Sequence, residues 1–338
     1  MSSFSFWVGN YARPDEAGLQ LWRFSEESGF TVQGAYCGLR NPSFVLQHPS
    51  LPALYAVEEG PEGQITSWDL SGPVPVMSAR LSTGGADPCH LGISADGRWI
   101  YTANYTGGSV ACYPLDEKGG LLPRTDLVQH RGHSVNHDRQ EGPHAHCVFP
   151  AEGNDLYVCD LGLDQVIHYR NQDGRLEEIG VIAFPAGAGP RHLAFHPLYP
   201  SLLFCLSELS AELFVINRDR EFIQSRLSLL PESCLAGNTA AALHFTADGR
   251  WLIASQRGQD VLSVIHLAPD GTPSLYATVP TLPVPRDFLI RGNTLIVGSQ
   301  QDGRVQACRL ADGEITPTDR FLRAPAPVCF QPAFHSPV

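Results

Sequence analysis

The sequence predicts an all-β fold, a seven-bladed β-propeller in which the two ends of the chain share one blade. The prediction depends on an internal repeat, on the spacing of its copies, and on incomplete copies at both ends of the chain. Six segments share one pattern, in which a turn and an apolar strand are followed by a short turn and a second apolar strand. They are NPSFVLQHPSLPALYAVEE, DPCHLGISADGRWIYTANY, GPHAHCVFPAEGNDLYVCD, GPRHLAFHPLYPSLLFCLSE, AAALHFTADGRWLIASQRG and VPRDFLIRGNTLIVGSQQ.

The copies recur at the spacing of propeller blades. The residues that open the first strands lie 46, 56, 46, 51 and 44 residues apart, and they are Phe44, His90, His146, His192, Leu243 and Asp287. A repeat of about 40–50 residues that contains several short strands is typical of a propeller blade. Helical repeats of similar length would carry apolar residues at a spacing of about 3.6, which these segments lack.

Each end of the chain carries half of a further copy. APVCFQP (326–332) repeats the start of a unit but lacks its second strand, and FSFWVGNY (4–11) resembles a second strand without a first. We expect the two halves to complete a seventh blade, which closes the ring and leaves no open sheet edge. Seven blades in 338 residues give about 48 residues per blade, and we expect residues 1–338 to form a single domain.

The composition excludes several classes of protein. The apolar content of 43% supports a large core, and no run of eighteen apolar residues predicts a membrane span. The first residues, MSSFSFWVGN, read as a strand and not as a signal peptide. None of the nine cysteines forms a CxxC pair, so we expect reduced thiols in a cytoplasmic protein. A net charge of 23 − 35 = −12 argues against nucleic acids and membranes as partners.

Polar residues are expected to gather at one mouth of the ring, because the second strand of a hairpin returns to the end where the first began. The residue fourteen places after each opening residue is polar, if a two-residue insertion is allowed for in the fourth repeat. Asn10 takes the same position in the seventh blade. This set is Glu58, Asn104, Asp160, Glu208, Arg257, Gln301 and Asn10. The first strands contribute His90, His144, His146, Arg191, His192, Arg286 and Asp287. A funnel with convergent polar groups is the default position of a binding site.

Deviations from the repeat are the best indication of function. Glu208 and Arg257 take equivalent positions with opposite charges, which no shared packing role explains. The arginines suit an oxyanion, a carboxylate or a phosphate, and either Glu208 or a neutral histidine could activate water. A repeated histidine also fits a structural role, which applies to His90 and His192. Adjacent strand residues point to opposite faces, so we expect Arg191 to hold an anion and His192 to support it.

The loop HRGHSVNHDRQEGPHAH (130–146) could hold a metal, because His144 and His146 form an HxH pair. However, the chain has no HExxH motif and no carboxylate at ligand spacing from the pair. It also lacks a GxSxG nucleophile motif and a glycine-rich phosphate loop between a strand and a helix. We therefore expect neither a metal nor an organic cofactor.

Several stretches together resemble the propeller lactonase family, which includes 6-phosphogluconolactonases of the cycloisomerase type and the fungal carboxymuconate-lactonizing enzyme. The resemblance covers nearly the whole chain. It includes QEGPHAH (140–146), DLGLDQV (160–166), GAGPRHLAFHP (187–197), SELS (207–210), ADGRWLIASQRG (247–258) and PRDF (285–288). The chain departs from the family at Ser207 and Gln256, where members commonly have asparagine.

This resemblance implies lactone chemistry without a metal. It places a histidine, two arginines and a glutamate in the funnel, which here match His144 or His146, Arg191, Arg257 and Glu208. We expect further substrate contacts from His90, Asn104, Asp160, His192, Arg286 and Gln301.

The leading hypothesis is hydrolysis of 6-phosphogluconolactone, with a small anionic lactone as the partner of a monomer or weak homodimer. The alternatives are hydrolysis of an unphosphorylated sugar lactone, a muconate cycloisomerisation, or a non-catalytic propeller that binds other proteins. The usual signs of such a scaffold, GH…WD pairs and a long basic or aromatic stripe, are absent from the sequence.

Overall fold

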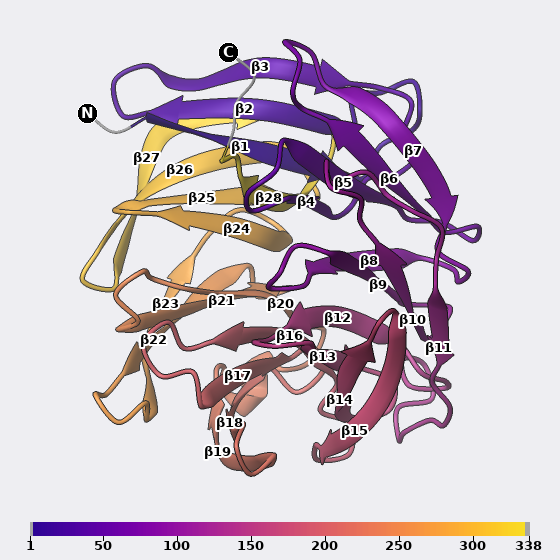
Figure 1. Cartoon of the computed structure of the whole chain (residues 1–338). Coiled ribbons are helices and arrows are strands. Elements are labelled where there is room, and N and C mark those ends of the chain that lie inside the picture. The colour runs from indigo at the N-terminus through magenta and orange to yellow at the C-terminus, as the bar shows by residue number, and fades with distance from the viewer. Residues whose placement is uncertain (1–2, 335–338) are drawn as a thin grey trace.

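The computed structural model describes residues 3–334 and contains seven four-stranded antiparallel sheets, which confirms the predicted seven-bladed propeller. Figure 1 shows the sheets around a central axis, with β4, β8, β12, β16, β20, β24 and β28 innermost. We number the blades 1 to 7 in the chain order of these innermost strands. Within the described residues, no helix has the length and apolarity needed to cross a bilayer.

The strands of blades 1 to 4 follow one another from the inside of the ring to the outside. Blade 1 contains β4 (Val45–Gln47), β5 (Ala53–Glu58), β6 (Gln64–Asp69) and β7 (Val76–Ser82). Blade 2 contains β8 (Pro88–Ile93), β9 (Trp99–Asn104), β10 (Ser109–Pro114) and β11 (Asp126–Gln129). Blade 3 contains β12 (Ala145–Pro150), β13 (Asp155–Asp160), β14 (Gln165–Gln172) and β15 (Arg175–Ala183). Blade 4 contains β16 (Pro190–Phe195), β17 (Leu202–Ser207), β18 (Glu212–Asn217) and β19 (Phe222–Ser228).

The remaining blades follow a short 3₁₀ turn, η1 (Glu232–Cys234). Blade 5 contains β20 (Thr239–Phe245), β21 (Trp251–Arg257), β22 (Val261–Leu267) and β23 (Pro273–Pro280). Blade 6 contains β24 (Pro285–Arg291), β25 (Thr294–Ser299), β26 (Arg304–Ala311) and β27 (Glu314–Arg323). Blade 7 contains β28 (Pro327–Pro332), β1 (Ser3–Asn10), β2 (Leu19–Ser25) and β3 (Gly29–Tyr36).

The ring is closed by the pairing of β1 with β28, as the half-repeats at the two ends predict. Val8 lies opposite Phe330 and Phe6 opposite Pro332 in this antiparallel pair. Phe6 packs in a core cluster shared with blade 6, whereas Trp7 packs in a cluster shared with blade 1. Alternate side chains of β1 therefore join blade 7 to its two neighbours.

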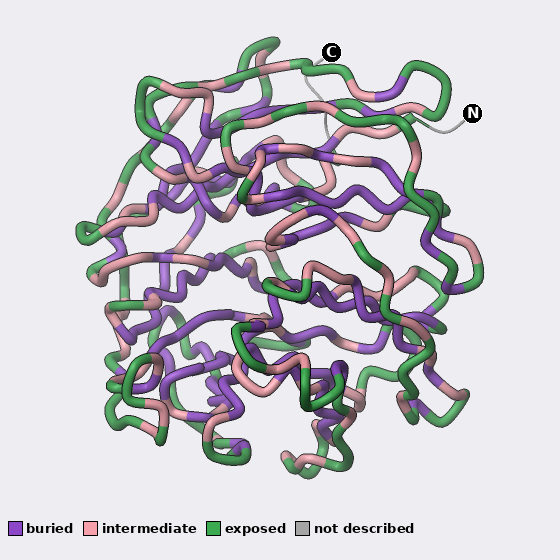
Figure 2. Tube along the Cα trace, turned by 180° about the vertical axis from the view of Figure 1, so that it is seen from behind, coloured by how far each residue is buried: buried purple, intermediate pink, exposed green. Residues whose placement is uncertain are grey.

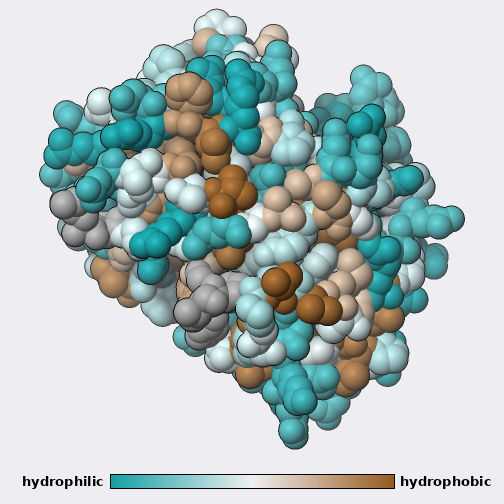
Figure 3. Space-filling view, turned by 90° about the horizontal axis from the view of Figure 1, so that it is seen from above, coloured by the Kyte–Doolittle hydropathy of each residue, from teal (hydrophilic) through white to brown (hydrophobic). Residues whose placement is uncertain are grey.

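The apolar core lies between neighbouring blades. The second strands of blades 1 to 6 are almost wholly buried, whereas an outermost strand such as β7 alternates between exposed and half-buried residues. Figure 2 shows buried segments near the axis and exposed segments at the periphery. Figure 3 shows a largely hydrophilic surface on the side seen from above, with apolar residues in small separate groups.

A β-bulge near the start of the innermost strand recurs in six of the seven blades. In blade 4, for example, Pro190 lies opposite Ser207 and His192 opposite Leu206, which leaves Arg191 as the extra residue. His146 is the extra residue of blade 3 and Cys89 that of blade 2. A bulge releases one residue from the ladder and re-aims its side chain. The sequence pattern that aligns His146 with His90 and His192 is therefore wrong by one residue, because His146 corresponds to Arg191.

Closure of the ring gives a stability prediction. Phe6→Ala should lower the free energy of unfolding by about 3–5 kcal/mol, because it opens a cavity in the core cluster that joins blades 6 and 7. Denaturant titration measures this change. The matched control is Phe321→Ala on β27, whose side chain is exposed and whose loss should cost less than about 0.5 kcal/mol. Equal losses in the two variants would contradict the role of β1 in closing the ring.

Candidate active site

The bulges and the ends of the second strands bring side chains from several blades to one mouth of the central channel. We call this set of side chains the funnel. It comprises Tyr11, Glu59, Cys89, Tyr105, Arg139, His146, Arg191, Glu208, Arg257 and Arg286. Most come from innermost-strand bulges or from the residue at or just after the end of a second strand. Arg139 instead comes from the long loop between β11 and β12.

Glu208 is the centre of this funnel, because three arginines contact its carboxylate. Its Oε2 accepts from Arg191 Nε at 2.8 Å and lies 3.0 Å from Arg257 Nη2. Arg139 Nη2 donates to Oε1 at 2.6 Å and also to the hydroxyl of Tyr105 at 3.1 Å. The side chains of Glu208 and Arg191 are almost fully buried, whereas that of Arg139 is 36% exposed. The carboxylate thus ties together blades 4 and 5 and the loop before blade 3.

The arginines keep Glu208 ionised. Burial by itself would raise the pKa of this carboxyl, but the charges of Arg257 and Arg191 hold it far below its usual value. A carboxylate with so low a pKa, and with its oxygens occupied by guanidinium groups, is a poor general base. Its role in this geometry is to orient the arginines and to neutralise part of their charge.

His146 is available as a base. Its Nε2 lies 4.0 Å from Glu208 Oε2, and the thiol of Cys89 lies 3.4 Å from its backbone oxygen. Burial, followed by the charge of Arg191, lowers the pKa of His146 well below its usual value, so the imidazole is neutral at physiological pH. Burial and the charge of Glu59 raise the pKa of Cys89, so its thiol stays protonated and is a poor nucleophile.

His144 is held differently from His146. Its ring stacks on Tyr105 at 4.5 Å, and its Nδ1 lies 3.1 Å from the Tyr105 backbone oxygen. The other ring nitrogen, Nε2, lies 3.2 Å from a carboxylate oxygen of Glu141. Both nitrogens of His144 therefore face acceptors of the protein. Of the two histidines that the sequence left as alternatives, His146 has the longer contacts, because its Nδ1 lies 3.9 Å from Cys89 Sγ and its Nε2 lies 4.0 Å from Glu208 Oε2.

The predicted polar ring separates into two registers. Glu208 and Arg257 face the funnel, but four other members lie one position earlier in their blades and support the surrounding loops. These four are Asn10, Glu58, Asn104 and Asp160, whose partners are loop backbone, Ser109, Arg80 and His130. Gln301 is exposed in the turn after β25. The prediction that all seven face one opening is thus wrong for these five.

In blades 1, 2 and 7 the residue that occupies the funnel position lies one place further along the chain, and in blade 3 the buried Leu161 takes this place. Tyr11, Tyr105 and Glu208 each donate their backbone N–H to the residue before the innermost strand, and so does Gln300 in blade 6. Adjacent strand residues point to opposite faces, so a register error of one residue exchanges the two sets. His90 and His192 both follow the bulge and lie opposite Ala103 and Leu206, so the hairpin of blade 4 is longer than that of blade 2 by one residue. The count allowed two residues for this insertion, which set Asn104 against Glu208.

His90, His192 and Asp287 do not belong to the funnel. They line a cavity of about 420 Å³ at the other end of the channel, together with apolar residues such as Phe149 and Phe245. His192 Nε2 lies 3.1 Å from Arg191 Nη1 and must accept from it, since arginine is only a donor. His90 Nδ1 accepts from the Val148 N–H at 3.4 Å, and Asp287 bonds His244 and the Phe330 N–H. Each of these three residues therefore has a hydrogen-bond partner within the protein. For His192, this partner is Arg191, the residue that it was expected to support.

Sequence reasoning missed five of the funnel residues. Tyr11, Glu59 and Tyr105 each follow a member of the predicted ring, so a shift of one residue would have found them. Cys89 precedes His90 in the same way, at the position of Arg191 in its own blade. Arg139 could not be found by comparison of the repeats, because it lies in a loop that the other blades do not have.

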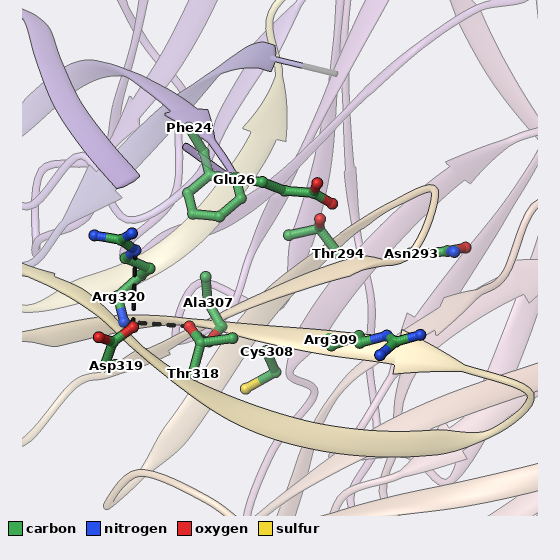
Figure 4. A pocket seen from close by; sticks show the side chains of 10 residues that line it. All are labelled: Phe24, Glu26, Asn293, Thr294, Ala307, Cys308, Arg309, Thr318, Asp319 and Arg320. Atoms are coloured by element: carbon green, nitrogen blue, oxygen red, sulfur yellow. Dashed lines mark hydrogen bonds and ion pairs between the residues drawn. The ribbon is translucent and has the colours of Figure 1, made fainter. Parts of the chain in front are cut away.

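No other place in the described residues resembles this site. Among residues 3–334, no group of three His, Cys, Asp or Glu side chains is arranged to hold a metal ion. Figure 4 shows a cavity of about 590 Å³ at the outer edge of blades 6 and 7, lined by residues such as Phe24, Arg309 and Arg320. Its charged groups are exposed, and Arg320 pairs loosely with the neighbouring Asp319. Nothing there matches the buried charge cluster of the funnel.

The fold and the funnel define a class, the seven-bladed β-propellers with a cluster of polar and charged side chains at one mouth of the central channel. Residues 5–332 match the family described as "Lactonase, 7-bladed beta-propeller", and the chain belongs to this lactonase family. The 6-phosphogluconolactonase of Bacillus subtilis is 28% identical over 97% of this chain and 98% of its own.

Two solved structures are similar to this chain over nearly its whole length. The periplasmic gluconolactonase of Pseudomonas aeruginosa has a TM-score of 0.88 and 27% identity over 98% of this chain and 99% of its own. A protein from Lactobacillus plantarum has a TM-score of 0.90 and 27% identity over 98% of this chain and 100% of its own.

The charge cluster predicts a stability effect. Glu208→Gln should lower the free energy of unfolding by about 3–5 kcal/mol, because it leaves buried Arg191 and Arg257 without their counter-charge. A group whose folded-state pKa is depressed contributes stability above its unfolded pKa, and this stability is lost as the pH falls through the folded value. The loss in the variant should therefore be constant between pH 5 and pH 8. The control is Glu16→Gln in an exposed pair with Arg13, and a loss no larger than in this control would contradict the assignment.

Proposed function

We propose that this protein hydrolyses a phosphorylated aldonolactone, 6-phosphogluconolactone, to 6-phosphogluconate. The observation that carries the proposal is the excess of positive charge in the funnel. Four arginines (Arg139, Arg191, Arg257 and Arg286) are opposed by two carboxylates, Glu208 and Glu59, which leaves a net charge of 4 − 2 = +2. The whole chain carries −12. A phosphate monoester carries about −1.5 to −2 at pH 7, which matches this local excess.

The relatives support lactone hydrolysis, but their names point to two different substrates. The Bacillus subtilis protein is named for a phosphorylated lactone and the Pseudomonas aeruginosa protein for an unphosphorylated one. A neutral sugar lactone would leave the excess charge of the funnel without a counter-ion. The cost of keeping cations buried without partners favours the phosphorylated substrate.

Arg257 is the best donor for the oxyanion that forms during hydrolysis. Its Nη2 contacts Glu208, but its Nε is buried without an acceptor among the described residues. A buried donor without an acceptor in the protein needs a partner from outside it, which water supplies in the free protein and the substrate would supply in the complex. A charged donor aimed at a developing negative charge stabilises the transition state more than the ground state. Arg191 is already committed to Glu208, Ala241 and His192, so it acts mainly by holding this arrangement.

The reaction then follows from the placement of His146. The neutral imidazole takes a proton from water as the water oxygen attacks the lactone carbonyl carbon, and the carbonyl oxygen becomes an oxyanion beside Arg257. Collapse of the tetrahedral intermediate breaks the bond between this carbon and the ring oxygen. The ring oxygen takes the proton from the imidazolium and becomes a hydroxyl group. The product is a hydroxy acid, which ionises to the carboxylate.

A panel of lactones tests the proposal. The purified protein should hydrolyse 6-phosphogluconolactone with a kcat/KM at least about 10-fold above that for glucono-1,5-lactone, since a charged hydrogen bond contributes about 1.5–3 kcal/mol. Rates must be corrected for spontaneous ring opening. A higher efficiency on the neutral lactone would overturn the phosphorylated substrate, and turnover of a muconate alone would replace hydrolysis by cycloisomerisation.

The role of His146 predicts a pH profile. The base is active when deprotonated and its pKa lies below the usual histidine value, so kcat/KM should stay level from pH 8 to pH 6.5 and fall only in more acid solution. His146→Gln should lower kcat about 10²–10⁴-fold and abolish this acid limb. The control, His144→Gln, should retain the limb because His144 faces Tyr105 and Glu141. The reverse pattern would make His144 the base.

Hydrolysis should also survive exhaustive chelation. The arginines around Glu208 occupy its oxygens and repel a cation, so this carboxylate is a poor metal ligand. Activity is measured after prolonged treatment with EDTA and with 1,10-phenanthroline. A loss that one particular divalent ion restores would assign His144 and His146 to a metal and overturn the mechanism.

A further inference from the structure

Arg286 differs from the other three arginines of the funnel, because within residues 3–334 its side chain makes neither an ion pair nor a hydrogen bond. Arg139, Arg191 and Arg257 each lie within 3.0 Å of Glu208. Arg286 belongs to the same cluster, since its charge acts on its neighbours. Burial lowers the pKa of Arg257 to about 10, and repulsion by Arg191 and Arg286 contributes to this shift. Burial opposes the charge of Arg286, but Tyr11, Glu59 and Glu208 lie near enough to raise its pKa, so it stays charged. A charged guanidinium group that has no ion pair within residues 3–334 has an unused capacity for an anion.

The backbone and a tyrosine fix the place of Arg286. The bulge of β24 lies between Pro285 and Phe288, and it turns Asp287 to the far side, where it bonds the Phe330 N–H at 2.7 Å. The guanidinium carbon of Arg286 lies 5.3 Å from the centre of the Tyr11 ring. The Tyr11 hydroxyl is in turn fixed by both carboxylate oxygens of Glu59, at 2.9 and 3.0 Å. A guanidinium group over an aromatic face keeps its N–H edges free for bidentate contact with an anion.

Arg286 lies across the channel from the proposed base. Arg286 is on blade 6 and Tyr11 on blade 7, whereas His146 is on β12 of blade 3. In a ring of seven, blades 6 and 7 are the two most distant from blade 3, as Figure 1 shows for β12, β24 and β28. A ligand that contacts both His146 and Arg286 must therefore extend across the funnel.

We propose that Arg286, seated over Tyr11, is the subsite for the phosphate of the substrate, and that the lactone carbonyl lies on the opposite side against His146 and Arg257. This inference rests on the proposed function and adds the orientation of the substrate. It identifies the substrate class as a lactone whose phosphomonoester is at the far end from its carbonyl. Glu59 offsets part of the charge of Arg286, but its oxygens are engaged by Tyr11, and the funnel keeps its net positive charge.

Kinetics on two matched lactones test the subsite. Arg286→Ala should lower kcat/KM for 6-phosphogluconolactone about 10- to 200-fold, mainly through a higher KM, because it removes charged hydrogen bonds to the phosphate. Hydrolysis of glucono-1,5-lactone should change less than about 2-fold, since this substrate has no group for the subsite. Arg286→Lys keeps the charge but not the bidentate edge, so it should recover part of the loss. An equal loss on both lactones, or no loss on either, would overturn the proposal.

The control variant is Arg13→Ala, which removes one positive charge from an exposed site near the same mouth. It should leave both lactones nearly unchanged. A loss on 6-phosphogluconolactone as large as that of Arg286→Ala would mean that Arg286 acts only through the general field of the protein, which would overturn the subsite.

Binding of the stable products separates this proposal from the proposed reaction. In calorimetric titrations, 6-phosphogluconate should bind the wild type at least about 10-fold more tightly than gluconate, and Arg286→Ala should abolish this preference. If the wild type hydrolyses neither lactone but shows this preference, the proposed reaction fails and the subsite stands. If Arg286→Ala binds 6-phosphogluconate as tightly as the wild type does, the subsite is wrong whatever the activity.

Discussion

The ion pairs between Glu208 and its three arginines are the interaction on which the rest of the funnel depends. Arg191 and Glu208 are both almost fully buried, and a buried charge is expensive unless it is paired. One carboxylate here serves arginines from three separate segments of the chain, so these segments hold one another in register. The same pairing depresses the pKa of Glu208, which is why the proposed mechanism uses His146 and not Glu208 as the base.

The β-bulge of the innermost strands is the backbone feature that makes this arrangement possible. In a regular strand, neighbouring side chains alternate between the two faces. The bulge directs Arg191 to the funnel while His192, the next residue, lines the cavity at the other end of the channel. Through the hydrogen bond between them, His192 helps to hold the side chain of Arg191 in the funnel. The six bulges allow the funnel to be varied at one position per blade without disturbing the core between blades.

The charges of the funnel are distributed unevenly in a way that suits an elongated ligand. On the side of blades 3 to 5, arginine, glutamate and histidine are tightly interconnected, which suits a reacting group that must be held at a fixed place. On the side of blades 6 and 7, Arg286 packs against the Tyr11 ring and has no ionic partner among residues 3–334. The proposed substrate, a phosphorylated lactone, would place its reacting group at the rigid end and its phosphate at the open end.

The sequence by itself determined the fold. Blade repeats depend on local patterns of apolar strands and turns, and half-repeats such as FSFWVGNY are legible without knowledge of their partners. The sequence also identified the arginines and Glu208 as candidate site residues, because they are charged at positions where the other blades have different residues. The resemblance to the lactonase family pointed to the same residues.

The tertiary structure decided which neighbours of these residues face the funnel. The count along the chain allowed one residue too many for the insertion in blade 4, and a shift of one residue exchanges the two faces, so the count placed Asn104 and Asp160 where Tyr105 and Leu161 lie. The long loop that brings Arg139 to Glu208 has no counterpart in the repeat, and its course depends on long-range contacts such as the bond of His130 to Asp160. Which arginine lacks a partner is likewise a property of distances between blades, and a sequence contains no such distances.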